Sequence, residues 1–203
     1  MREIIAYLPP NKYSRPGRHA EMEVRMLLIH WNGVPKQRAW GTWQFFADKV
    51  FTGKTDDDCA SAQGVIDQEG PIIRTMPHLP DVVEMAYHAV DNYPNYNPEA
   101  IKILGILINA HTIGYEWCCN DSSGKPTEET WASAVEVYAQ DCVAYGLDPM
   151  TRIETHNWVT GKGTWGIPAR EGPCHKYFVE HPEELDRFRG EVSKYVELQG
   201  GGM

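Results

Sequence analysis

The segment 154–177 decides how this chain is interpreted. It reads Glu154-Thr-His-Asn-Trp-Val-Thr-Gly-Lys162, continues through a turn-rich stretch, and then contains Gly172-Pro-Cys-His175. His156 follows a strand-like run, and Cys174 lies eighteen residues later, behind Gly-Pro. Zinc binds imidazole nitrogen and thiolate sulfur readily, and a catalytic zinc has three protein ligands and one open position. The segment therefore supplies two candidate zinc ligands and requires a third.

His30 is the candidate for the third ligand. It lies near the end of an apolar run from Val24 to Trp31, which is typical of a buried strand. Ligands of open α/β sheets bind at the carboxyl ends of the strands. Alone, each residue has an ordinary alternative: a histidine is usually hydrogen-bonded or at the surface, and a cysteine is usually a small buried apolar group. The spacing of these three residues alone does not decide whether they bind a metal.

Composition favours one folded domain. At 203 residues and 42% hydrophobic content, the chain can bury one sizeable core. Its net charge of -9 argues against nucleic acid or an anionic membrane as the main partner, because either needs a basic surface. The sequence shows no bilayer-length apolar run and no secretory signal, so we expect a protein made in the cytoplasm. Five cysteines, two of them adjacent, favour reduced thiols.

Periodicity predicts a single α/β domain. The expected strands cover residues 4–8, 24–31, 61–67, 71–76, 82–89, 109–118 and 152–155, with 61–76 forming a hairpin around Gly70. The expected helices run to about residue 53, from 98 to about 105, from 127 to 146, and from 182 onward. In the first helix, the stripe Trp40, Trp43, Ala47 and Val50 is expected to face the core.

Glu116 is the candidate general base. It lies near the end of the expected strand 109–118. A metal-activated water needs a carboxylate that is not itself a ligand, to accept a proton and pass it to the leaving amine. The ordinary alternative is a solvated glutamate at a strand end.

Five motifs together resemble a known family. They are Leu-Leu-Ile-His30-Trp-Asn, Ser61-Ala-Gln-Gly-Val-Ile-Asp67, Ala86-Tyr-His88-Ala, Thr112-Ile-Gly-Tyr-Glu116, and Thr155-His-Asn-Trp-Val-Thr-Gly-Lys162 with Gly-Pro-Cys174. In this order they resemble the zinc-dependent N-acetylmuramoyl-L-alanine amidases of phage endolysins and bacterial autolysins, which share their fold with peptidoglycan recognition proteins. The resemblance covers nearly all of residues 24–196.

The resemblance implies a fold, a metal site and a reaction. The fold is a central mixed β-sheet flanked by α-helices, and the metal is Zn2+ held by His30, His156 and Cys174. The substrate is bacterial peptidoglycan, cleaved between N-acetylmuramic acid and L-alanine by zinc-activated water. Glu116 matches the general base of the family, and Lys162 matches a lysine that stabilises the oxyanion.

The same resemblance suggests substrate-binding residues at His88, Gln63, Trp31 and Trp158. Many relatives have a histidine and an aromatic residue where this chain has Gln63 and Gly64, so one wall of the cleft is expected to be more open. Trp158 and Trp165 either stack on sugars or pack the loop against the domain.

The loop between Lys162 and Cys174 departs from the family pattern. Relatives place the lysine very close to the cysteine, whereas here residues 163–172 intervene. Arg170 is therefore an alternative oxyanion cation, and His175 is an alternative to Cys174 as ligand.

We expect residues 1–197 to form the catalytic domain and residues 198–203 a flexible linker, with a wall-binding module possible beyond it. An endolysin of this kind acts on the wall after release from the cytoplasm. The alternatives are a non-catalytic peptidoglycan-binding module of the same fold, which typically lacks the cysteine ligand, and a cytoplasmic muropeptide-recycling amidase.

Overall fold

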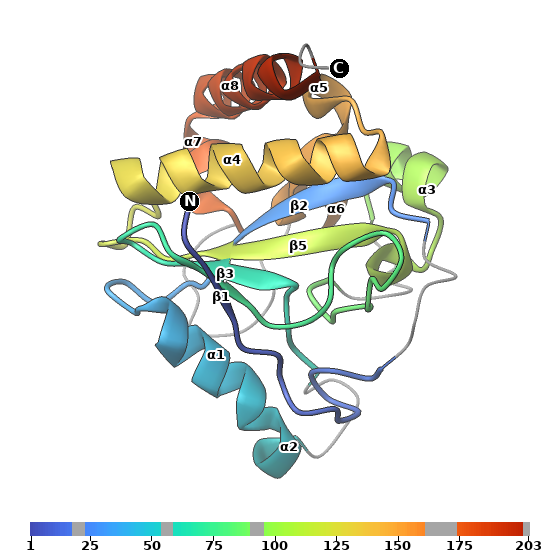
Figure 1. The fold of residues 1–203 in the computed structure, drawn as a ribbon, viewed down its shortest axis with the longest axis vertical. Helices are drawn as coiled ribbons and strands as arrows, with labels where there is room; N and C mark the ends of the chain where they lie inside the picture. Colours follow the sequence, from blue (N-terminus) through green and yellow to red (C-terminus); the bar gives the residue numbers. More distant parts are fainter. Residues whose placement is uncertain (18–22, 54–58, 90–95, 161–173, 201–203) are drawn as a thin grey trace.

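A mixed six-stranded sheet forms the centre of the chain (Figure 1). The computed structural model describes residues 1–17, 23–53, 59–89, 96–160 and 174–200. The strands are β1 (Glu3–Ile5), β2 (Met26–Trp31), β3 (Gly64–Ile66), β4 (Ile72–Arg74), β5 (Thr112–Trp117) and β6 (Ile153–Thr155), in the spatial order β1-β4-β3-β5-β2-β6. Only the β3–β4 pair is antiparallel. The predicted single α/β domain with a mixed sheet is confirmed.

Helices lie on both faces of this sheet (Figure 1). They are α1 (Ala39–Ala47), α2 (Lys49–Thr52), α3 (Pro98–Leu104), the 3-10 helix η2 (Ile108–Ala110), α4 (Glu128–Tyr145), α5 (Pro149–Arg152), α6 (His156–Thr160), α7 (Lys176–Glu180) and α8 (Pro182–Gly200). Among the described residues, we find no helix with the length and apolarity needed to span a membrane.

Alternation of side chains along the strands divides the core between the two faces. Leu27 and Ile29 of β2 belong to a cluster with Tyr115, Tyr138 and Phe188, which joins the sheet to α4 and α8. On the other face, one cluster packs α1 over β3 and β4. A further cluster packs α3 and α6 over Met26 and Leu28 of β2. The opposite face is thus covered by two separate groups of helices.

Helix ends and turns follow the sequence signals. Asn97 accepts a hydrogen bond from the Glu99 N–H at the start of α3, and Thr127 caps α4 in the same way. Gly146 ends α4 with the left-handed φ of 64° that glycine tolerates best. The hairpin of β3 and β4 also matches the prediction, with Gly70 at a φ of 93°.

The expected strand 82–89 is wrong. Its residues form no strand of the sheet; backbone and side-chain groups of other segments hold it instead, and the Tyr87 carbonyl, for example, accepts from the Ser61 N–H. The Tyr87 N–H donates to Ser61 Oγ, and the Glu84 carbonyl accepts from Gln63 Nε2. Val83 and Ala86 are buried, which explains why the composition resembled that of a strand.

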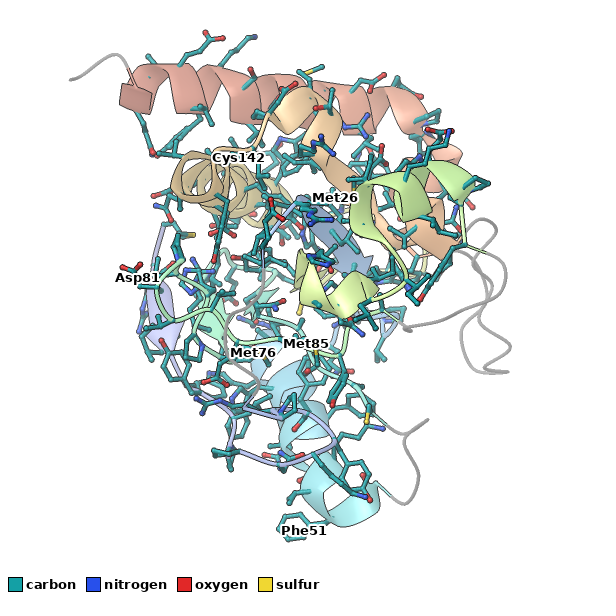
Figure 2. All side chains as sticks on the ribbon, turned by 90° about the vertical axis from the view of Figure 1, so that its right-hand side faces the viewer. Met26, Phe51, Met76, Asp81, Met85 and Cys142 are labelled. Atoms are coloured by element: carbon teal, nitrogen blue, oxygen red, sulfur yellow. The ribbon has the colours of Figure 1, made fainter. Side chains whose placement is uncertain are left out.

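The apolar stripe predicted for the first helix is also wrong in part. Trp40 is 50% exposed and Val50 is 43% exposed, whereas Phe46 is buried. The helix breaks at Asp48 into α1 and α2, so a 3.6-residue period does not continue across the break. Phe51 on α2 points away from the sheet at the end of the molecule (Figure 2).

At the other end of the chain, α8 continues to Gly200. Residues 198–200 of the expected linker are therefore helical.

A buried polar network lies between the sheet and α4. Arg74 Nη1 donates to the Tyr115 hydroxyl, which donates to Asp141 Oδ2, each at 2.5 Å. Arg74 also forms a salt bridge with Glu3. Burial raises the pKa of Asp141 to about 6, although the positive charge of Arg74 opposes the shift.

Replacing Asp141 by Asn is expected to change how stability depends on pH. Between pH 3.8 and about 6, the folded protein keeps a proton on Asp141 that the unfolded chain has released. Raising the pH through this window therefore lowers the free energy of unfolding of the wild type. The loss is up to about 3 kcal/mol, at about 1.4 kcal/mol for each unit of pKa difference. Urea unfolding should show this loss in the wild type and in the exposed control Asp81→Asn, but not in Asp141→Asn. Parallel pH profiles for all three proteins would contradict the assignment.

Candidate active site

The register of the central strands places His30 beside Glu116. His30 of β2 and Glu116 of β5 are Cα partners in a parallel pair, so their side chains leave the same face of the sheet. Thr155 of β6 pairs with Ile29, which puts the following residue, His156, next to His30. The two imidazole rings lie with their centroids 4.8 Å apart. Strand pairing thus assembles three of the predicted site residues.

Cys174 completes a group of possible metal ligands. One ligand atom from each of His30, His156 and Cys174 lies within 4.8 Å of the others. Cys174 Sγ is 3.9 Å from His30 Nδ1 and accepts a hydrogen bond from the Trp31 backbone N–H at 3.2 Å. The Cys174 carbonyl accepts from the Asn157 N–H at 2.5 Å. Two imidazoles and one sulfur in this arrangement fit the donor preferences of a catalytic zinc, which keeps a fourth position open.

Glu116 is largely buried at the carboxyl end of β5. Its strand lies between β2 and β3, with Val65 as the partner on the other side. The neighbouring residues on the same face are Gly114 and Thr112, which pair with Leu28 and Met26 of β2.

His88 contacts His30 directly. His88 Nδ1 lies 3.0 Å from His30 Nε2, and His88 Nε2 lies 3.1 Å from Thr112 Oγ1 and 3.3 Å from the Thr112 carbonyl. Burial lowers the pKa of His88 to about 4, so the ring is neutral at physiological pH. The predicted site residue His88 is therefore at the site, in contact with a candidate ligand.

Gln63 lies in the interior and not on a cleft wall. Its side chain is fully buried, and both ends of the amide bond to backbone: Oε1 accepts from the Gly114 N–H at 2.8 Å, and Nε2 donates to the Glu84 carbonyl at 3.2 Å. These bonds tie β5 to the irregular segment 82–89. Gln63 was predicted to bind substrate; in this structure both ends of its amide are engaged by backbone groups in the interior.

Trp31, also predicted to bind substrate, lies on the other face of the sheet from His30. It is 8% exposed and pairs with Trp117, on the face opposite His30. Its ring contacts the position that a Gly124 Cβ would occupy, at 3.4 Å. Trp158, on α6, is half-buried and packs against the cluster around Met26 and Leu28. The rings of Trp31 and Trp158 both make packing contacts in this structure.

His175 belongs to an aromatic cluster on the opposite face. Its ring lies 5.6 Å from that of Trp117 and 5.0 Å from that of Phe178. The side chain is fully buried, and neither ring nitrogen has a hydrogen-bond partner among the described residues. Burial lowers the pKa of His175 to about 3. The geometry thus favours Cys174 over His175 as the third ligand.

Lys162, Trp165 and Arg170 lie outside the described residues.

Sequence reasoning missed three residues that support the site. Thr112 contacts the His88 ring, and Asn109 Oδ1 accepts hydrogen bonds from the backbone N–H groups of His88 and Ala89. A Cβ on Gly114 would lie 2.5 Å from His88 Nδ1, so only glycine leaves room for the ring. A glycine inside a strand was the available signal, because it often marks a close approach of another group.

Gln63→Leu is expected to destabilise the fold without removing a substrate contact. The Gly114 N–H and the Glu84 carbonyl would lose their buried partner, at a cost of about 1–3 kcal/mol for each unsatisfied group. Urea unfolding measures the loss, with Gln199→Leu on the exposed side of α8 as the matched control. Unchanged stability combined with weaker substrate binding would return Gln63 to the cleft.

Solved structures share this fold. The catalytic domain of XlyA is 16% identical to the chain, with a TM-score of 0.63 that covers 95% of this chain and 99% of that one. At this identity the likeness concerns the fold alone.

Curated relatives come from two Bacillus species. A protein described as a probable N-acetylmuramoyl-L-alanine amidase of Bacillus licheniformis is 29% identical over 97% of the chain. The N-acetylmuramoyl-L-alanine amidase BlyA of Bacillus subtilis strain 168 is 28% identical over 77%. The chain spans less than half of either relative, 48% and 40% respectively.

The family profile described as N-acetylmuramoyl-L-alanine amidase, Amidase_2, matches residues 20–167. This range is more than half of the chain. It includes His30, Glu116 and His156 and ends before Cys174. The chain therefore belongs to the Amidase_2 family of N-acetylmuramoyl-L-alanine amidases.

Proposed function

We propose that this chain is the catalytic domain of a zinc-dependent peptidoglycan amidase. It would hydrolyse the amide bond between the lactyl group of N-acetylmuramic acid and the L-alanine of the stem peptide, in the bacterial wall. The observation that carries the proposal is the convergence of His30, His156 and Cys174 within 4.8 Å in a chain of the Amidase_2 family. The names of the curated relatives support the same reaction.

His30, His156 and Cys174 would hold the zinc ion. Zinc, when bound, supplies a Lewis acid that polarises the amide carbonyl and brings the pKa of a water near neutrality. The hydrogen bond from the Trp31 N–H to Cys174 Sγ helps to fix the position of the sulfur.

Glu116 would move the proton of the reaction. It lies beside His30 in the sheet register but belongs to no candidate ligand group among the described residues. A carboxylate in this place accepts a proton from the attacking water and gives it to the nitrogen of the departing alanine amine. Its burial limits the water around the carboxylate, which strengthens its interactions with the reacting groups.

The cation for the oxyanion would come from the segment after α6. Lys162 fits this role by its motif, with Arg170 as the alternative within the same segment. Trp158, on α6 just before that segment, remains the aromatic candidate for contact with a sugar ring.

Glu116→Gln tests the proposal directly. The amide cannot accept the proton, so hydrolysis of purified cell walls should fall by about 10²–10⁴-fold while bound zinc is retained. Release of new alanine amino-termini and loss of wall turbidity measure activity, and elemental analysis measures zinc. The exposed Glu197→Gln on α8 serves as the control.

Four results would overturn parts of this assignment. Full activity of Glu116→Gln would remove the residue from the mechanism, and loss of zinc would make it a ligand. A wild-type protein that binds walls but releases no alanine amino-termini would instead be a binding module. Cleavage of soluble anhydro-muropeptides only, without wall lysis, would indicate a recycling enzyme.

Cys174→Ser and His175→Phe form a matched pair of adjacent substitutions. A neutral hydroxyl is a poor replacement for a thiolate ligand, so Cys174→Ser should lose most of its zinc after dialysis. His175→Phe should keep zinc and activity, because it replaces a buried imidazole in an aromatic cluster by a ring of similar shape. Zinc loss in His175→Phe alone would reverse the choice of ligand.

A further inference from the structure

We propose that His88 is a positioning residue for the metal site, which holds His30 in one tautomer with Nδ1 available to the metal. The inference rests on the proposed function in that it assumes a metal at the His30, His156 and Cys174 group. It differs from the expectation that His88 binds substrate. Its evidence is a chain of hydrogen bonds that runs from the backbone of η2 to His30.

The chain begins at Thr112. The Thr112 hydroxyl donates its single hydrogen to the Ile108 carbonyl, at 2.9 Å. Thr112 Oγ1 can therefore only accept from His88, and the Thr112 carbonyl can also only accept. Both oxygens face His88 Nε2, at 3.1 and 3.3 Å. The buried ring nitrogens contact only His30 and Thr112 among the described residues, with no carboxylate to balance a second proton, so His88 carries one proton and it is on Nε2.

This assignment determines the tautomer of His30. With its proton on Nε2, His88 presents an unprotonated Nδ1, which lies 3.0 Å from His30 Nε2. Two bare ring nitrogens would repel at this distance, so His30 Nε2 carries a proton and donates it. His30 Nδ1 is then the unprotonated nitrogen of the ring, the form that binds a metal. This is the nitrogen that lies 3.9 Å from Cys174 Sγ, on the side of the ligand group.

The position of His88 is itself built into the fold. Asn109 Oδ1 accepts from the His88 N–H at 3.1 Å and from the Ala89 N–H at 2.8 Å, which fixes the backbone beside the ring. The ring occupies the space left by the missing side chain of Gly114. Both nitrogens of the buried ring are engaged by protein atoms, so this conformation leaves none for a substrate.

The expected consequence is a stronger and better oriented ligand. A metal-binding histidine that donates its second N–H to a fixed acceptor has its ring orientation set and its ligand nitrogen made more basic. Loss of such a partner typically weakens metal binding by about 10–100-fold.

His88→Leu and His88→Asn separate this role from simple packing. Leucine fills space but accepts no hydrogen bond, whereas the asparagine Oδ1 can accept close to the position of the histidine Nδ1. Competition with a chromophoric chelator gives the zinc dissociation constant of the full chain. We expect binding about 10–100-fold weaker in His88→Leu and largely restored in His88→Asn. Urea unfolding of the metal-free proteins shows how much each substitution costs the fold.

Nitrogen NMR of the metal-free wild type tests the same idea without a mutation. Long-range proton–nitrogen correlations should show His30 protonated at Nε2 and His88 protonated at Nε2. A His30 ring protonated at Nδ1 would overturn the inference.

The zinc measurements distinguish the two levels of the argument. Wild-type affinity in His88→Leu, or equal weakening in both variants, would overturn the positioning role while leaving the proposed function intact. A wild-type protein that takes up no zinc would instead overturn the metal site of the proposed function, and the positioning role with it.

Discussion

The parallel pairing of β2 with its neighbours is the constraint on which the site depends. It sets His30 against Glu116 on one side and brings His156 alongside from β6 on the other. A slip of one residue would turn His30 to the face covered by α4 and α8, because side chains alternate along a strand. The buried clusters on the two faces hold this register, so packing far from the site fixes the geometry of its chemistry.

The helices on the site face form two separate groups, and the polar residues of β5 lie between them. One group packs over β3 and β4, and the other packs over β2. Between them, β5 carries Thr112, Gly114 and Glu116 on the same side. A continuous helical layer would have buried these residues under apolar side chains. Here the irregular segment 82–89 lies over part of β5 and brings in a polar ring.

Sequence patterns predicted the features that depend on local chemistry. The strand with His30, the strand with Glu116, the caps at Asn97 and Thr127 and the left-handed Gly146 all follow from neighbouring residues. The sequence did not predict features that depend on which face a side chain meets. Trp31 and His175 are aromatic or basic residues adjacent to candidate ligands, yet they pack on the opposite side of the sheet.

Other errors have the same origin in tertiary structure. Gln63 was expected at the substrate from its place in the family motif. In the structure its side-chain oxygen accepts the hydrogen bond of the Gly114 N–H. The segment 82–89 has the apolar content of a strand, but separate hydrogen bonds to backbone and side chains of other segments hold it in place of a strand ladder. The stripe from Trp40 to Val50 assumes one continuous helix, which Asp48 interrupts. None of these can be decided until long-range neighbours are known.

Cys174 and His30 are far apart along the chain, so the candidate metal site forms only when distant parts of the chain have folded together. The two residues are 144 positions apart, and the backbone of Cys174 is tied to α6 while its sulfur contacts β2. Closing so long a loop carries an entropic cost that local structure does not repay. A polypeptide emerging from the ribosome would contain His30 long before it contained His156 and Cys174, which are only eighteen residues apart. The group of His30, His156 and Cys174 can therefore assemble only after the chain has been made as far as Cys174 and the sheet has formed.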